Sequence, residues 1–334
     1  MKLLKVFTIV LLVAVVVVSA QDMKSIKKEF KGIESLEIEL TSGDCEIKAG
    51  NSKTVTVEVK YDVKPEKNFE PEFVQKGKIL KLSEEWSGRN SRGNVLWTII
   101  APEKTEIEFS AASGDLSIEN MKTNIESGTA SGDVSIENCI GEFEIEAASG
   151  DIFAKNLEGD IEISTASGDI EIDDCKGDIE ISAASGDIEA KNLVGSLDMS
   201  VASGDVEVED CKGEFDLSAA SGDVEATGVI LDGSSSFSAA SGDVNVILEN
   251  TSKYDIEIGV ASGDATLDFN GNKITGTIEM TANKKRGKIN APFKADNTEE
   301  YEKNDRTYVK KTFNKGGEPV ITIKTASGEA TLKK

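Results

Sequence analysis

Histidine is absent from these 334 residues, and aromatic residues make up only 5% of them. Without histidine, Ser–His and Cys–His catalytic pairs and most zinc sites are excluded. Only two tryptophans and four tyrosines are available as platforms on which sugar rings could stack. A globular domain of this length usually has more aromatic bulk in its core. We therefore expect another kind of architecture to hold the chain together.

A run of apolar residues near the start has the layout of a secretory signal peptide. Lys2 and Lys5 precede the apolar residues 6–18, and Ser19-Ala20 form a small-residue cleavage site. The run is shorter than the about 20 residues that a membrane span needs. We predict a signal peptide over residues 1–20, with a retained anchor as the lesser alternative. The mature chain is then exported to the periplasm, the cell surface or the medium, with no membrane span.

Negative charge is concentrated in the middle of the chain. The formal net charge is −24, and residues 113–264 alone hold 35 Asp and Glu against 6 Lys. Nucleic-acid partners require the opposite sign of charge, so we expect none. An acidic surface of this kind favours solubility and attracts cations or basic partners.

An internal repeat of 18 residues dominates the sequence. The tripeptide Ser-Gly-Asp recurs at this spacing, and then twice more at intervals of 20 and 21. Such a period is the signature of a repeat architecture. The tripeptides begin at Ser113, Ser131, Ser149, Ser167, Ser185, Ser203, Ser221, Ser241 and Ser262.

Each repeat divides into two halves of nine residues that read as strands. Residues 168–176 are GDIEIDDCK, and residues 177–185 are GDIEISAAS. Apolar and acidic residues alternate in both halves, which predicts a strand with one buried face. Ile170 and Ile179 should point inward, whereas Glu171 and Glu180 should point outward. Glycine supplies the corner between halves.

One coil cannot bury its own inner face, so we predict a parallel β-solenoid of 18-residue, two-strand coils. Like strands should stack about 4.8 Å apart. A coil perimeter near 60 Å matches two strands of ~18 Å joined by two sheet gaps of ~10 Å. Two sheets are therefore enough, and a third is possible but cramped.

Two further columns of residues should line the interior. One alternates cysteine with leucine at positions 139, 157, 175, 193 and 211. Its cysteines lie two coils apart, about 9.6 Å, beyond the ~7 Å that a disulfide can bridge, so these and Cys45 should be free buried thiols. The other is expected at a tight inward corner, and comprises Ala130, Ala148, Ala166, Ala184, Ala202, Ala220, Ala240 and Ala261.

The outward carboxylates should form two columns. Neighbours ~4.8 Å apart repel by roughly 0.9 kcal/mol even in water, so something must offset the repulsion. Hydrogen bonds with the corner backbone or the neighbouring serine are the favoured explanation, and divalent cations between coils are the alternative. The first column is Asp115, Asp133, Asp151, Asp169, Asp187, Asp205, Asp223, Asp243 and Asp264, and the second is Glu126, Glu144, Glu162, Glu180, Asp198 and Asp216.

Modified ends should cover the regular coils, since an open end exposes an unpaired strand edge. Residues 21–112 contain irregular strand-like runs and are predicted to form an N-terminal capping β region. Regular repeats then occupy 113–264. Residues 265–334 form a C-terminal capping region, in which the polar, lysine-rich segment near 283–317 is expected to be a mobile loop or a small subdomain.

With these repeats and modified ends, the chain resembles the bacterial DUF4097-type family of candidate adhesins, with the head-GIN-type adhesins as relatives. The resemblance lies in residues 36–47 (LEIELTSGDCEI), residues 99–102 (IIAP), the Ala-Ser-Gly-Asp repeats and residues 323–328 (IKTASG). It covers nearly all of the mature chain. It implies a β-solenoid at the cell envelope and brings no catalytic residue with it.

The residues favour a non-enzymatic scaffold for adhesion or interaction at the cell envelope. We predict no catalytic residue, no cofactor and no metal ligand, and an unknown protein or glycan as partner. A cation-binding structural surface protein is one alternative. A polysaccharide-active β-helical enzyme is a weaker one, because the carboxylates form uniform columns rather than one differentiated pair. An ice-binding hydroxyl face at Ser164, Ser182, Ser200 and Ser218 is disfavoured by the flanking glutamates.

Overall fold

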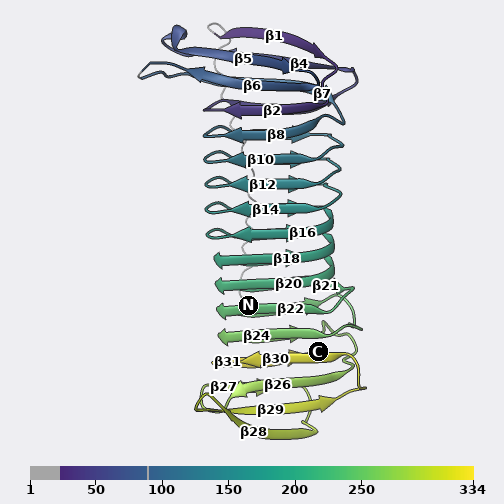
Figure 1. The fold of residues 1–334 in the computed structure, drawn as a ribbon. Helices are drawn as coiled ribbons and strands as arrows, with labels where there is room; N and C mark the ends of the chain where they lie inside the picture. The colour runs from purple at the N-terminus through teal and green to yellow at the C-terminus, as the bar shows by residue number, and fades with distance from the viewer. Residues whose placement is uncertain (1–22, 89) are drawn as a thin grey trace.

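The computed structural model describes residues 23–88 and 90–334, and the predicted signal peptide lies outside these ranges. The chain winds into an elongated all-β solenoid with 31 mostly parallel strands (Figure 1). A single short 3-10 helix, η1 (Glu66–Asn68), interrupts the strands of the described residues. Within those residues, no helix has the length and apolar character needed to cross a membrane.

Two strand series wind along the solenoid, which we name sheet A and sheet B. From β8 to β25, each strand of a series pairs in parallel with the next strand of the same series, which is two places further along the chain. The regular strands of sheet B are β8 (Glu106–Ala111), β10 (Ile125–Thr129), β12 (Phe143–Ala147), β14 (Ile161–Thr165), β16 (Lys176–Ala183), β18 (Val194–Ser203), β20 (Lys212–Ser221), β22 (Ser235–Ser241) and β24 (Ile256–Ser262). Those of sheet A are β9 (Leu116–Glu119), β11 (Val134–Glu137), β13 (Ile152–Lys155), β15 (Ile170–Asp173), β17 (Ile188–Lys191), β19 (Val206–Glu209), β21 (Val224–Leu231), β23 (Val244–Leu248) and β25 (Ala265–Asp268).

The register places like residues on top of one another. Ile170 pairs with Ile152 on one side and with Ile188 on the other. In sheet B, Ile179 lies between Ile161 and Leu197 in the same way. All of these side chains are at most 2% exposed. The alternating pattern of the sequence therefore builds one continuous apolar core along the axis.

Where the chain passes from sheet A to sheet B, the connecting segments of successive coils form a narrow third ladder. Single bridges connect Lys122 to Ile140, Ile140 to Glu158, and Glu158 to Lys176. The preceding turn requires a left-handed backbone, which asparagine and aspartate adopt more readily than other non-glycine residues. Positive φ values of 52–63° mark this turn at Asn120, Asn138, Asn156, Asp174, Asn192 and Asp210.

The alanine column lies outside the core, so the prediction of an inward corner was wrong. Ala166 and Ala184 are exposed, whereas the preceding residues Thr165 and Ala183 are buried. The alternation of strands β14 and β16 continues one residue past their ends, and this turns the alanine outward. Only after the alanine does the chain bend at Ser-Gly-Asp.

At the N-terminal end, the first coil of the chain is not the outermost one. Strands β2 (Ser35–Leu40) and β3 (Asp44–Gly50) pair with β8 and β9 on their inner side. Their outer neighbours come from later in the chain and are β6 (Ile79–Trp86) and β7 (Val95–Pro102). Three antiparallel strands cover this end: β1 (Lys24–Lys31), β4 (Thr54–Tyr61) and β5 (Phe69–Lys76).

The C-terminal end has the same inverted order. Strands β30 (Val320–Thr325) and β31 (Gly328–Lys333) pair with β24 and β25, and are covered by β26 (Thr277–Asn283) and β27 (Gly287–Asn290) (Figure 1). Residues 283–317 are therefore not simply a polar loop. They contain β27 and an antiparallel hairpin of β28 (Asn297–Lys303) and β29 (Arg306–Asn314), which extends sheet B beyond β26.

The polar side chain of Ser127 lies within the apolar core, and replacing it tests how the core contributes to stability. Ser127 is 2% exposed, lies between Phe109 and Ile145, and its hydroxyl has no hydrogen-bond partner. An unsatisfied buried polar group costs about 1–3 kcal/mol.

Ser127→Ala should therefore stabilise the chain by about 1 kcal/mol in urea unfolding. The outward Ser164→Ala should change stability by less than about 0.5 kcal/mol. A loss of stability in Ser127→Ala would contradict this assignment.

Candidate interaction surface

The aspartates at the Ser-Gly-Asp corner form a continuous hydrogen-bonded ladder. The N–H of Asp187 donates to Asp169 Oδ1 at 2.9 Å, and the N–H of Asp133 donates to Asp115 Oδ1 at 3.0 Å. The bond with the corner backbone was predicted, but it reaches the next coil rather than the residue's own corner. The acceptors in the series are Asp44, Asp115, Asp133, Asp151, Asp169, Asp187, Asp205, Asp223, Asp243 and Asp264.

This ladder gives different expectations for two substitutions of Asp169. Asp169→Ala removes the acceptor of the Asp187 N–H, and we expect a loss of about 1–2 kcal/mol of unfolding free energy. Asp169→Asn keeps an oxygen acceptor and removes one of the stacked charges. It should therefore match or exceed the stability of the original chain. Equal losses in both variants, measured by urea unfolding, would show that the charge rather than the acceptor is needed.

The four cysteines are structural, as predicted. All are free and buried. Burial raises the pKa of Cys139, Cys175 and Cys211 to about 11, so their thiols are protonated and poor nucleophiles at neutral pH. Their sulfur atoms also accept backbone hydrogen bonds from the preceding coil, as between the Leu157 N–H and Cys175 Sγ at 3.3 Å. These residues therefore offer no reactive site.

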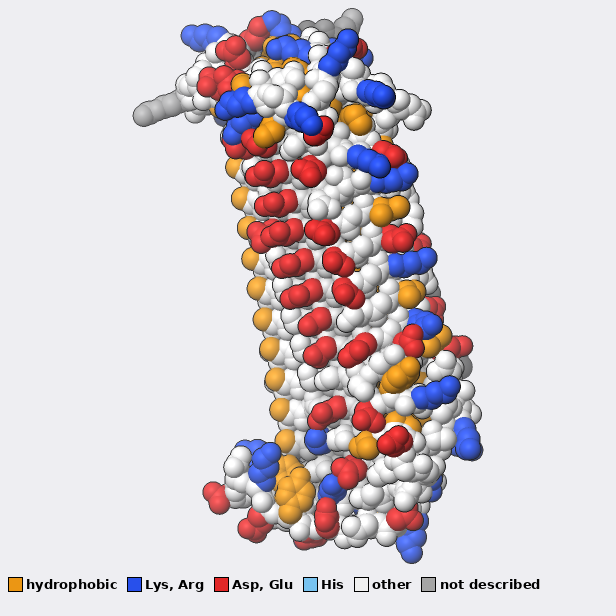
Figure 2. Space-filling view, turned by 45° about the vertical axis from the view of Figure 1, so that its right-hand side comes forward, with side chains coloured by type: hydrophobic (Ala, Val, Ile, Leu, Met, Phe, Trp, Pro, Cys, Tyr) orange, Lys and Arg blue, Asp and Glu red, His pale blue; other side chains and the backbone are white. Residues whose placement is uncertain are grey.

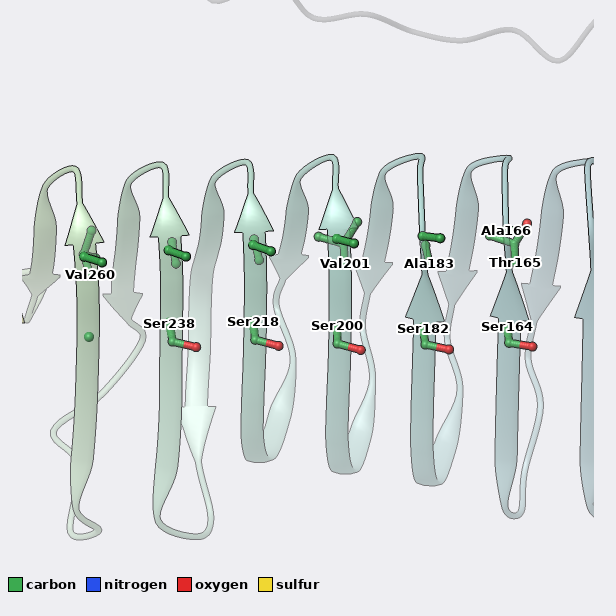
Figure 3. Close-up of a pocket in the computed structure, with 18 of the residues that line it drawn as sticks. Ser164, Thr165, Ala166, Ser182, Ala183, Ser200, Val201, Ser218, Ser238 and Val260 are labelled. Carbon is green, nitrogen blue, oxygen red and sulfur yellow. The ribbon is translucent and has the colours of Figure 1, made fainter.

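A long groove runs along the outer face of sheet B, across the strands. Its volume is about 1570 Å³, and it is lined by the outward residues at the ends of the sheet B strands together with the buried residues between them. One lining column is the alanine column described above. The other, here called the serine column, comprises Ser164, Ser182, Ser200, Ser218 and Ser238, whose hydroxyls all point the same way along the solenoid in Figure 3.

The second carboxylate column lies next to this groove on the outer face of sheet B, one outward position beyond the serine column, and is here called the carboxylate wall. It consists of Glu126, Glu144, Glu162, Glu180, Asp198 and Asp216. Its last four members lie two residues before Ser164, Ser182, Ser200 and Ser218, whereas Gly128 and Glu146 occupy the equivalent positions after the first two. Figure 2 shows columns of acidic side chains parallel to the axis, with an apolar column at the left edge of the solenoid. Its members from Glu126 to Asp198 line a second, more acidic groove of about 860 Å³.

The β28–β29 hairpin closes one end of the groove. Tyr301 and Tyr308 stack there with ring centroids 5.7 Å apart, and Lys303 lies at the end of the same hairpin. Lys324 of β30 also lines this end, and its Nζ lies 2.7 Å from Glu257 Oε1. The groove therefore has a basic, aromatic end and lies beside a column of carboxylates.

The acidic columns predict how stability depends on pH. Burial, followed by repulsion from Asp198, raises the pKa of Asp216, and burial with repulsion from neighbouring glutamates raises that of Glu207. Carboxyl groups with a raised pKa in the folded state bind protons more tightly when folded, so stability increases as pH falls toward that pKa. The melting temperature at constant ionic strength should therefore be higher at pH 5 than at pH 7.5.

One carboxyl group, that of Asp173, sets the acidic limit of this pH effect. Burial raises the pKa of Asp173, but hydrogen bonds from Lys155 and Asn192 outweigh it and leave a lowered pKa. Its stabilising effect is lost only in more acidic solution, below its ordinary value of 3.8. In Asp216→Asn the rise between pH 7.5 and pH 5 should be smaller. A melting temperature that falls steadily from pH 7.5 to pH 5 would contradict the expectation.

Comparison with known families now identifies the chain. The family model described as Toastrack DUF4097 matches residues 33–195 and 193–278, which is well over half of the sequence. The chain belongs to the Toastrack DUF4097 family. This confirms the resemblance drawn from the Ala-Ser-Gly-Asp repeats. No curated protein matches the chain.

Several solved structures are similar to this Toastrack protein, with low sequence identity. A candidate cell adhesion protein from Clostridium sporogenes is 14% identical, with 93% of this chain and 99% of that one covered and a TM-score of 0.21. A candidate adhesin from Bacteroides fragilis is 15% identical, with coverages of 94% and 97% and a TM-score of 0.31. A candidate lipid-binding protein from Parabacteroides distasonis is 14% identical, with coverages of 93% and 98% and a TM-score of 0.37.

Part of the outer surface of this Toastrack protein was predicted correctly from the sequence. The serine column and both carboxylate columns face outward, as the period-two pattern predicts. The groove itself was missed, because the alanines were assigned to the interior and the hairpin was not expected. Among residues 23–88 and 90–334, no group of three or more Cys, Asp and Glu side chains is placed to hold a metal ion.

Proposed function

We propose that this Toastrack protein is an exported, non-catalytic scaffold that binds a partner at the cell envelope through the groove of sheet B. The observation that carries the proposal is the continuity of this groove. The same small side chains recur on successive coils from Ser164 to Ser238, so one partner molecule can contact many identical rungs. Repeated weak contacts of this kind suit adhesion.

The carboxylates favour a binding role over catalysis. Glycosidases need one acid and one base or nucleophile whose environments push their pKa values apart. On this face, Glu126, Glu144, Glu162 and Glu180 occupy equivalent positions on successive strands. Nothing distinguishes one of them as an acid and its neighbour as a nucleophile. The corner aspartates use one oxygen each for backbone hydrogen bonds, which also weakens the cation-binding alternative.

An attachment assay tests the proposal. The purified chain would be immobilised, and binding of intact envelopes from the source cells would be compared with that of a variant carrying Ser182→Trp and Ser200→Trp. Both serines lie on the outer face, so the bulky rings should fill the groove and leave the core intact. We expect envelope binding to fall to the background level. Unchanged binding, with an unchanged melting temperature, would show that the groove is not the binding surface.

Export is tested separately. Full-length and Δ1–20 chains would be expressed in the source organism and followed by cell fractionation. We expect the full-length chain in the envelope or the medium and the truncated chain in the cytoplasm. Full-length chain confined to the cytoplasm would overturn the cellular part of the proposal.

A further inference from the structure

We propose that the groove of sheet B binds an extended basic polypeptide segment in the polyproline II conformation, with Lys or Arg at every third position. This inference rests on the proposed function and specifies the partner. It is argued from the charge of the carboxylate wall beside the groove, from the spacing of the rungs, from the hydroxyl row and from the aromatic end.

Charge complementarity selects a basic partner. The carboxylate wall runs beside the groove along the coils, and Glu162, Glu180 and Asp198 are all exposed. Residues 113–264 hold 35 acidic residues and only 6 lysines, so the wall has few basic neighbours to neutralise it. A partner with cationic side chains on the side facing the wall would relieve the repulsion between stacked carboxylates. An anionic polymer would be repelled.

The rung spacing selects the backbone conformation. Successive rungs are about 4.8 Å apart, so every second carboxylate of the wall recurs at about 9.6 Å. A polyproline II helix rises ~3.1 Å per residue and has three residues per turn, which repeats each side-chain direction at about 9.3 Å. A β-strand repeats its faces at about 6.6–6.8 Å and would fall out of step with the rungs. Basic residues at every third position would therefore meet alternate carboxylates.

The serine column suits a chain without internal hydrogen bonds. A polyproline II segment leaves its backbone carbonyls free to accept hydrogen bonds from outside. Ser164, Ser182, Ser200, Ser218 and Ser238 present one hydroxyl per rung, all with the same orientation (Figure 3). The exposed alanines on the other side are small enough to let a peptide backbone approach closely. The floor also contains Thr165, which is 5% exposed and has a hydroxyl without a hydrogen-bond partner.

The closed end of the groove fits the same ligand. Aromatic grooves are the usual sites at which proline-rich segments dock, and Tyr301 and Tyr308 stack against each other at this end. Lys303 and Lys324 lie nearby and would repel a basic residue, so the cationic part of the ligand should stop before them. The rungs from Gly128 to Lys324 span about 38 Å, which corresponds to about 12 residues of polyproline II.

A second copy of this chain fits the groove less well. The same carboxylate columns would be brought close to each other, and both copies carry a strongly negative net charge. A contact strip of about 38 Å by 13 Å buries roughly 500 Å² per partner, below the roughly 800 Å² of a standard interface. A linear cationic ligand avoids both difficulties.

Fluorescence anisotropy with a labelled, amidated peptide of four Lys-Pro-Pro repeats tests the inference. Glu162→Gln, Glu180→Gln and Asp198→Asn would be combined in one variant. The matched control combines Glu171→Gln, Glu189→Gln and Glu207→Gln on successive strands of sheet A, and changes the net charge equally. We expect the peptide to bind the original chain, with an affinity about tenfold lower in the first variant and changed less than about twofold in the control.

Two further peptides make the result specific. Four Glu-Pro-Pro repeats should not bind, and four Lys-Gly-Gly repeats of equal charge should bind more weakly because they must be ordered on binding. Equal losses in both triple variants, or equal affinity for the proline and glycine peptides, would overturn the inference. If no basic peptide binds but Ser182→Trp with Ser200→Trp still abolishes envelope attachment, the proposed function stands and the peptide ligand is rejected. The peptide ligand would likewise be rejected if an amino-sugar oligomer bound in its place and lost affinity in the carboxylate-wall variant.

Discussion

Replacing Gly177 by alanine should destabilise the solenoid by about 3 kcal/mol or more. Gly177 lies at the corner where its coil enters sheet B. Its φ of 140° belongs to a region of backbone conformation that residues with a Cβ rarely adopt. A Cβ at this position would also lie 1.9 Å from the carbonyl oxygen of Gly159 in the preceding coil. That contact is with backbone, so it can be relieved only if two stacked coils move apart.

The control for Gly177→Ala is the same substitution at a glycine that has room. Gly259 lies within β24 without a left-handed φ, and a Cβ added to it would have no neighbouring atom within 4 Å. Gly259→Ala should therefore change the unfolding free energy by less than about 0.5 kcal/mol or increase it slightly, since glycine weakens a strand interior. Both variants would be compared by urea unfolding. Similar stabilities would mean that the corner can be rearranged at little cost.

The crowding at Gly177 also explains why the register could be predicted from the sequence. Glycines 159, 177 and 195 lie above one another at van der Waals limits, so a coil that slips by one residue would place a side chain in that contact. The same slip would expose the isoleucines of one face. Two independent constraints therefore fix the stacking, and both are visible in the spacing of glycine and isoleucine.

The outward position of the alanines could not be read from their small size. Alanine fits an inward corner and an exposed ridge equally well, and only the burial of the residue directly before it decides between them. Thr165 and Ala183 complete the buried alternation, and Ala166 and Ala184 then fall outside. Because the alanine column forms one side of the groove, this error concealed that side of it.

The inverted order at both ends was beyond sequence reasoning for a different reason. Residues 320–333 repeat the pattern of a regular coil, and this pattern shows that they stack but not upon which neighbour. The coil next to β24 could equally have been built by β26, which follows sooner in the chain. The choice depends on long-range contacts, such as those of Ile321 with Ile256 and Ile278, that no local pattern encodes.

This order makes strand β30 the connection in sheet B between the regular coils and the C-terminal cap, as β31 is in sheet A. Ile323 is fully buried and lies between Ile258 of β24 and Met280 of β26. Ile323→Ala should therefore cost about 2–5 kcal/mol, because it leaves a cavity between two layers of the core. The loss should appear first as a local opening of β26, β29 and the hairpin that closes the groove, since these strands attach to the coils through β30.

Val320→Ala on the same strand is the matched control, because Val320 is 40% exposed and an aliphatic side chain is again shortened to alanine. It should change stability by less than about 0.5 kcal/mol. Hydrogen exchange followed by mass spectrometry would show faster exchange in residues 277–314 of Ile323→Ala, while residues 113–221 stay protected. Uniformly faster exchange along the whole chain would instead mean that the solenoid unfolds as one cooperative unit, and that β30 carries no special role in attaching the cap.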